Sequence, residues 1–239
     1  MIANALFSRQ SKAKGFTLLE LLIVITILAI LAVIIIFVLN PAETLKKSRD
    51  VQRLSDLATL KNAIALYATT VSSPDFDAAV GLCLSGTTST ARIAYSSVVA
   101  DPTCTNNPAE GADTGATFAS DACFTAGNSV STVTLADGTG WLPINLTAIT
   151  GGSPISNLPI DPTNTSISTT PSSSDLVYRY ACQSTGDTGK PSGIFEINAV
   201  LESDAFKTDD KKMEKDGGDN TAYYEIGTSV KLMGTGTAF

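Results

Sequence analysis

The hydrophobic residues of the chain are concentrated in one block near its N-terminus. Residues 16–39 are apolar apart from Glu20 and two threonines. A helix rises about 1.5 Å per residue, so this block would extend about 36 Å, which is enough to cross a bilayer. It is longer than the usual core of a signal peptide, and no A-x-A type cleavage site follows it. The pattern therefore predicts a transmembrane helix that is retained in the mature protein.

A second helical pattern follows a break in the chain. Asn40-Pro41 interrupts the apolar run, and because proline lacks an amide donor we expect a kink or local melting of the helix at Pro41. Across residues 40–72 apolar side chains recur every three or four positions, and charged side chains fill the other face. This amphipathic helix would pack its apolar stripe under a globular head. The stripe consists of Leu45, Val51, Leu54, Leu57, Leu60, Ile64, Tyr67 and Val71.

The remaining residues, 73–239, predict a loop-rich head with a small antiparallel sheet. Small and polar residues dominate the first half of the head, so long loops with a few short strands are expected there. The candidate short strands are the segments 92–99, 131–135 and 141–146. Three later segments combine alternating hydrophobicity with aromatic residues, and each predicts a longer strand. They are residues 176–182, 193–201 and 223–227. A long helix followed by a sheet makes the expected fold class α+β.

Charge orients the chain in the membrane and narrows its function. Arg9, Lys12 and Lys14 precede the apolar block without an acidic residue, so residues 1–15 are expected in the cytoplasm and residues 41–239 outside. The formal charge of −7 disfavours broad binding of nucleic acid. The chain contains no histidine, the commonest general base and metal ligand, and shows no recognised catalytic spacing. We therefore expect no enzyme, no catalytic residue and no resident metal or other cofactor.

A basic cluster lies just beyond the predicted membrane helix. Lys46, Lys47, Arg49 and Arg53 could contact phosphate, but Asp50 lies among them. We interpret the cluster as a solvated helix face or a source of salt bridges between subunits, and we assign no nucleic-acid site.

Four cysteines follow the membrane segment, and their spacing favours disulfides. Cys83, Cys104, Cys123 and Cys182 form no CxxC pair of the kind that zinc or thiol redox chemistry uses. In an exported domain two disulfides are the natural interpretation, and free buried thiols in a reducing compartment are the alternative. Three pairings are open, and we favour Cys83 with Cys104 and Cys123 with Cys182.

A glycine-containing loop near the C-terminus gathers oxygen ligands. Residues 208–220 contain several aspartates, which suit calcium, but the spacing is not that of an EF-hand and lysines compete for the carboxylates. We favour a solvated charged loop over a calcium site.

Glu20 is the anomaly of the apolar block, because a carboxylate in a hydrophobic helix needs a partner or a proton. No basic residue lies between positions 16 and 45. One interpretation is a tolerated glutamate near the membrane interface. The other is that Glu20 pairs with a positive charge that processing of the chain creates.

The segment Lys14-Gly15-Phe16-Thr17-Leu18-Leu19-Glu20, with the apolar run behind it, resembles the class III signal of type IV pilins and type II secretion pseudopilins. The resemblance implies that a prepilin peptidase cuts after Gly15 and methylates the new N-terminus at Phe16. It also implies that Glu20 assists assembly. In a filament Glu20 could neutralise the Phe16 amine of a neighbouring subunit in a low-dielectric core. A pair between Phe16 and Glu20 of one helix, four residues apart, is the competing assignment.

The expected function is that of a pilin, a structural subunit of an extracellular filament that serves adhesion, motility or DNA uptake. Its expected partners are further copies of itself, the prepilin peptidase, an inner-membrane assembly platform and, before assembly, the cytoplasmic membrane that it crosses once. A pseudopilin of a type II secretion system shares nearly all of these features. A membrane-anchored enzyme or binding module is the alternative from a different class.

Overall fold

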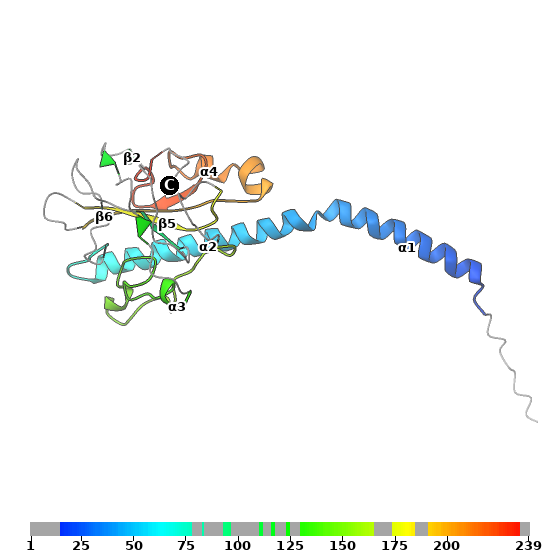
Figure 1. The fold of residues 1–239 in the computed structure, drawn as a ribbon, viewed down its shortest axis with the longest axis horizontal. Helices are drawn as coiled ribbons and strands as arrows, with labels where there is room; N and C mark the ends of the chain where they lie inside the picture. Colours follow the sequence, from blue (N-terminus) through cyan, green and yellow to red (C-terminus); the bar gives the residue numbers. More distant parts are fainter. Residues whose placement is uncertain are drawn as a thin grey trace, which may run out of the picture. The chain divides into compact units, whose positions relative to one another are not determined.

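The computed structural model describes residues 15–77, 83, 93–96, 110–111, 116–117, 123–124, 130–164, 174–184 and 191–234, and the structural statements below refer to these residues. The chain divides into two compact units, Met1–Thr44 and Leu45–Phe239. The first unit contains the apolar helix, and the second contains most of the amphipathic helix together with the head (Figure 1). The amphipathic helix is therefore part of the head's compact unit from Leu45 onward.

Two helices meet at the expected break in the chain. Helix α1 spans Leu18–Leu39, and Asn40 after it adopts the left-handed conformation, with φ of 35°. Asparagine tolerates this conformation better than most residues with a side chain. Helix α2, Pro41–Thr70, begins on the proline itself, where the missing N–H removes no helical hydrogen bond. The interruption thus lies at Asn40-Pro41, as the sequence predicts.

The second half of α2 packs against the head, as the amphipathic pattern predicts. Its buried apolar residues are Leu57, Leu60, Ala63, Ile64 and Tyr67.

The first half of α2 does not follow the predicted apolar stripe. Leu45 and Val51 are 61% and 53% exposed, whereas Asp50 and Arg53 have no exposed surface. This half contacts the head through buried charged side chains in place of apolar ones.

The head contains a mixed five-stranded sheet with the order β4-β1-β5-β6-β7. Four of its strands pair antiparallel, and only β4 pairs parallel, with β1. The α+β fold class is confirmed. The strands are β1 (Ile93–Tyr95), β4 (Cys123–Phe124), β5 (Arg179–Ser184), β6 (Pro191–Ala199) and β7 (Tyr224–Gly227), and a separate pair consists of β2 (Glu110–Gly111) and β3 (Ala116–Thr117).

Alternation along the strands produces two buried layers. On β6 the side chains of Phe195 and Ile197 join the cluster that includes the apolar face of α2. On β5, Ala181 belongs to a second cluster that includes Leu232 and Met233 near the C-terminus. Because successive side chains of a strand point to opposite faces, the two clusters lie on opposite faces of the sheet.

The loop segment before β5 contains short helices where strands were expected. Residues 131–135 lie largely in α3 (Val130–Val133), so the predicted strand there is wrong. Residues 141–146 contribute one isolated bridge, between Asp137 and Asn145, and the start of η1 (Leu146–Ala148). The reason is local packing around the buried Trp141, whose backbone N–H donates to the carbonyl of Val133 and whose indole N–H donates to that of Pro159.

Candidate functional site

The start of α1 is held by a capping box between Thr17 and Glu20. The Thr17 hydroxyl oxygen accepts from the backbone N–H of Glu20 at 3.2 Å. In return, Oε2 of Glu20 accepts from the backbone N–H and the hydroxyl of Thr17, both at 3.0 Å. This reciprocal arrangement satisfies donors that the first turn of a helix otherwise leaves unpaired.

The capping box corrects one part of the sequence interpretation. Glu20 already has a hydrogen-bond partner in the uncleaved chain, namely Thr17, so its position does not depend on processing alone. The pattern T-x-x-E ahead of an apolar run could have revealed this role. Both of the carboxylate's bonds go to Oε2.

The Gly15-Phe16 bond is exposed immediately before the helix begins. A side chain built on Gly15 would meet no atom within 4 Å, and Phe16 is 81% exposed. The structure therefore places the predicted processing residues in an exposed segment ahead of the cap. It does not bring the Phe16 backbone to Glu20, whose described bonds go to Thr17.

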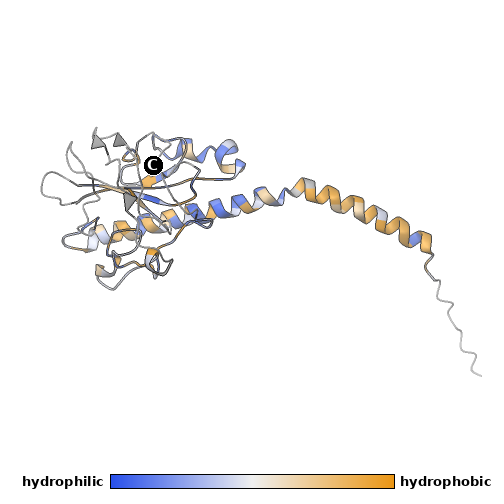
Figure 2. Cartoon of the chain, viewed as in Figure 1, coloured by the Kyte–Doolittle hydropathy of each residue, from blue (hydrophilic) through white to orange (hydrophobic). Residues whose placement is uncertain are grey.

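Helix α1 is apolar all around its circumference, as its colouring in Figure 2 shows. Its large apolar side chains, from Leu18 to Val38, are between 47% and 81% exposed. It is also long and apolar enough to cross a membrane. A helix without a polar face cannot remain in water, so lipid or other protein chains must cover it.

Arg53 lies at the centre of a buried ion network between α2 and the head. Its Nε and Nη2 donate to the two carboxylate oxygens of Asp161, at 2.6 and 2.9 Å. Its Nη1 donates to Asp50 and to Glu202, each at 2.7 Å. The side chains of Arg53, Asp50 and Asp161 have no exposed surface. A bidentate pair of this kind fixes α2 at one position along the head.

The same network extends to two further groups. Asp50 accepts from the backbone N–H groups of Glu202 and Ser203 and from the Ser203 hydroxyl. Arg49 donates from Nε to Glu202 at 2.8 Å and is about one-third exposed. The bond from Arg49, together with that from Arg53, lowers the pKa of Glu202 although its partial burial opposes this.

These contacts correct the interpretation of the basic cluster. Arg49 and Arg53 form salt bridges within the subunit, and Arg53 is not on a solvated face. Lys47 instead lies over the ring of Phe206, in η2 (Ala205–Asp209), at 6.0 Å from its centroid. One part of this network could be predicted from the sequence. Asp50 and Arg53 lie three residues apart, and residues at this spacing are neighbours on the surface of a helix.

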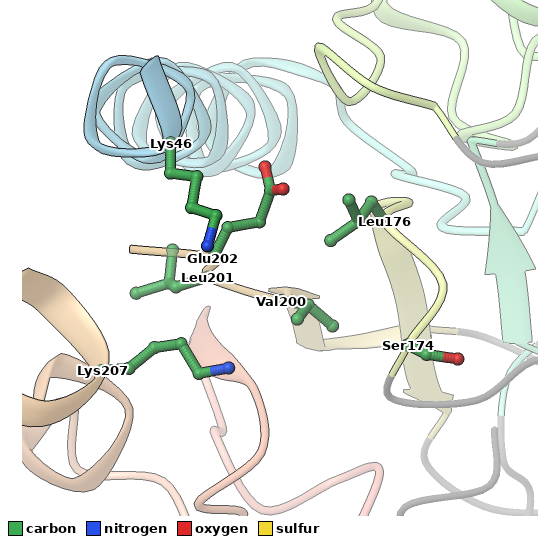
Figure 3. A pocket seen from close by; sticks show the side chains of 7 residues that line it. All are labelled: Lys46, Ser174, Leu176, Val200, Leu201, Glu202 and Lys207. Atoms are coloured by element: carbon green, nitrogen blue, oxygen red, sulfur yellow. The ribbon is translucent and has the colours of Figure 1, made fainter. Parts of the chain in front are cut away.

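A hollow of about 250 Å³ lies beside this network. Lys46 extends into it from α2 and Lys207 from η2, while Glu202 points from it toward α2 (Figure 3). The other lining residues are Ser174, Leu176, Val200 and Leu201.

A disulfide joins Cys83 to Cys182 on β5. The predicted pairing of Cys83 with Cys104 and of Cys123 with Cys182 is therefore wrong. Cys182 points into the core layer that contains α2, and the segment before Cys83 is anchored there, because Phe76 accepts a hydrogen bond from the Tyr180 hydroxyl. Cys104 lies outside the described residues, and so does the side chain of Cys123.

Removing this disulfide should destabilise the head. Because it closes a segment of 99 residues, Cys83→Ser should cost about 2 to 5 kcal/mol of unfolding free energy. Urea unfolding of the full chain in detergent, followed through the single Trp141, measures the loss. The double variant with Cys182→Ser should cost no more than either single variant. Additive losses would contradict the pairing.

In the loop that was considered for calcium, Lys211 and Lys212 pair with acidic side chains. Lys211 pairs with Glu214 at 3.0 Å, and Lys212 pairs with Asp210 at 2.9 Å. Lys212 and Glu214 belong to α4 (Lys212–Lys215). Across the described ranges, no group of three or more metal-binding side chains is spaced to hold an ion. The absence of a calcium site stays a prediction, which calorimetry with calcium can test.

Comparison with known proteins identifies the N-terminal segment. Residues 10–36 match the family model of the prokaryotic N-terminal methylation motif. This region contains Gly15, Phe16, the capping box and most of α1. No match was found among characterised proteins or among solved structures.

Proposed function

We propose that the chain is the pilin of a type IV pilus-like extracellular filament, because its residues 10–36 match the prokaryotic N-terminal methylation motif. Processing after Gly15 would release the subunit from its leader, and α1 would form the filament core. The observation that carries the proposal is α1 itself, which is exposed and apolar on every side. Adhesion, motility or DNA uptake would be the use of the filament.

The geometry at Glu20 supports a specific assembly contact. Processing would create an ammonium at Phe16, one residue before the cap. Oε1 of Glu20 carries none of the capping bonds, which go to Oε2. A neighbouring subunit's Phe16 ammonium could therefore bind Oε1 while the cap stays intact. Inside a bundle of apolar helices this charged hydrogen bond would be much stronger than in water.

The proposed partners follow from the steps of processing and assembly. A prepilin peptidase would cut and methylate the chain while α1 spans the cytoplasmic membrane with the leader inside. An inner-membrane assembly platform would then transfer the subunit to a helical polymer of identical copies. The disulfide between Cys83 and Cys182 suits a head that is exported to an oxidising compartment.

A pseudopilin of a type II secretion system is the second candidate, because it would use the same motif and helix. The disulfide-linked, loop-rich head favours the pilin, since it suits a surface exposed outside the cell. A membrane-anchored enzyme or binding module is the weakest candidate. Catalytic turnover by the purified chain on any substrate would support it.

Electron microscopy of cells that produce the chain tests the proposal. Cells that contain the peptidase and the assembly platform should carry surface filaments that an antibody against the head labels along their length. Cells that lack the peptidase should carry none. Labelling confined to the envelope, with secretion dependent on the chain, would favour the pseudopilin.

A further inference from the structure

The C-terminal residues 228–234, here called the strap, cross the sheet face opposite α2. Their backbone begins against β6, where Thr228 and Ser229 donate to the carbonyl of Phe195. Leu232 and Met233 are fully buried in the second core cluster. The strap thus closes this face of the sheet.

A buried glutamate on β6 holds the strap in place. Oε2 of Glu196 accepts from the backbone N–H of Leu232 at 2.7 Å and of Met233 at 3.0 Å. Glu196 has no exposed surface. Two backbone donors on one oxygen indicate a carboxylate that acts as an acceptor, and these bonds replace the water that the strap excludes.

A second buried glutamate lies beside the first on the neighbouring strand. Glu225 on β7 is opposite Asn198 of β6, which puts it on the same sheet face as Glu196. Its Oε2 accepts from the backbone N–H of Asn220 at 3.0 Å, whereas its Oε1 has no donor among the described residues. Gly218 packs so closely against this carboxyl that a side chain there would overlap it.

We propose that Glu196 and Glu225 share a bound proton that locks the strap onto the sheet, and that loss of this proton releases the strap. Two adjacent carboxylates in a buried site cannot both remain ionised, because each would repel the other without water to screen the charge. With the proton on Glu225, its unpaired Oε1 becomes a donor toward Glu196. Glu196 then keeps its charge for the two amides of the strap.

Of the charged groups around the pair, Asp216 favours this proton. From the loop before β7, Asp216 accepts from the backbone N–H of Glu225 at 2.8 Å and adds negative charge. On β5, Arg179 donates to the carbonyl groups of Val177 and Asp175, and its guanidinium lies 4.6 Å from the centroid of the Tyr223 ring. Asp219 lies in the same loop as Asp216, and Lys231 is exposed on the strap.

The direction of the pH dependence follows from these surroundings. Burial, and then the charge of Glu196, raise the pKa of Glu225, and burial raises the pKa of Glu196. Groups with a raised pKa stabilise the fold most at low pH. Their contribution begins to fall above the ordinary value of 4.5 and is lost as the pH rises through the raised values. The strap should therefore be held in acid and released in alkali.

Hydrogen exchange of the full chain in detergent micelles tests the proposal. Protection factors of Leu232 and Met233, corrected for intrinsic exchange, should decrease between about pH 5 and about pH 9, by up to about tenfold per pH unit as the shared proton is lost. Glu225→Gln keeps a neutral donor beside Glu196, so it should remove most of this decrease. Glu214→Gln, a partly exposed carboxyl outside the cluster, should behave as the wild-type chain.

Two results would overturn the proposal. Constant protection of the strap in the wild-type chain over this pH range would do so without any variant. An unchanged pH profile in Glu225→Gln would also do so. Fluorescence of the single Trp141 shows whether that variant is folded. If it does not fold, the wild-type profile alone decides.

Discussion

Replacing Glu20 by glutamine is expected to reduce filament assembly by about tenfold or more and to leave the head folded. The substitution removes the negative charge that we assign to the neighbouring Phe16 ammonium, and hydrogen bonds between charged groups are about twice as strong as neutral ones. Glutamine still accepts the backbone N–H of Thr17, because a capping box uses either Glu or Gln at this position. The variant thus separates the charge from the cap. The measurement is the amount of subunit in sheared surface filaments relative to the total in the cell.

Thr17→Ala is the matched control for this experiment. It removes the hydroxyl of the cap and keeps the carboxylate of Glu20. We expect it to assemble close to the wild-type level, because a tightly packed helix bundle tolerates one lost cap. If Glu20→Gln assembles normally and Thr17→Ala does not, Glu20 acts only as part of the cap and the assembly contact is wrong.

Replacing Arg53 by methionine is expected to destabilise the head by about 3 to 5 kcal/mol. The change removes the cation and leaves Asp50 and Asp161 buried without the charge that they now pair with. Denaturant unfolding of the full chain in detergent measures the loss.

The control is Arg49→Gln, which changes a partly exposed member of the same network. Its loss should stay within about 1 kcal/mol, since exposed ion pairs contribute little. The network also has a pH signature. Because the pKa of Glu202 is lowered, its contribution is present above the ordinary carboxyl value and is lost as the pH falls. The difference in unfolding free energy between the wild-type chain and Arg53→Met should therefore become smaller as the pH falls. Equal losses in the two variants would contradict the central place of Arg53.

The parts of the fold that sequence could predict are those that depend on local pattern. The unbroken apolar run defines α1, Asn40-Pro41 breaks the helix, and alternation with aromatic residues marks β5, β6 and β7. Each signal lies within a few residues of the element that it predicts. The capping box at Thr17 is equally local.

The parts that sequence did not predict join distant residues. Arg53 meets Asp161 across 108 positions, and Cys83 meets Cys182 across 99. Neither spacing produces a periodic pattern in the sequence. The basic cluster was therefore interpreted as a solvated helix face, and the pairing of the cysteines remained open. The shared burial of Glu196 and Glu225 likewise depends on the register of β6 against β7.

The exposed apolar residues in the first half of α2 bear on the proposed filament. Leu45 and Val51 keep the helical spacing of an apolar stripe but do not pack against their own head. The proposed filament gives them a partner, because a neighbouring subunit could cover them. The periodic stripe therefore predicted burial correctly in the second half of α2, whereas burial of Leu45 and Val51 depends on the proposed filament.

Mass spectrometry of the N-terminal peptide from sheared surface filaments tests whether this chain is a processed filament subunit. We predict a peptide that begins at Phe16 and carries one methyl group on its amine, from filaments in which this chain is a main component. A peptide that begins at Met1 or elsewhere before Gly15, or filaments that lack the chain, would contradict it.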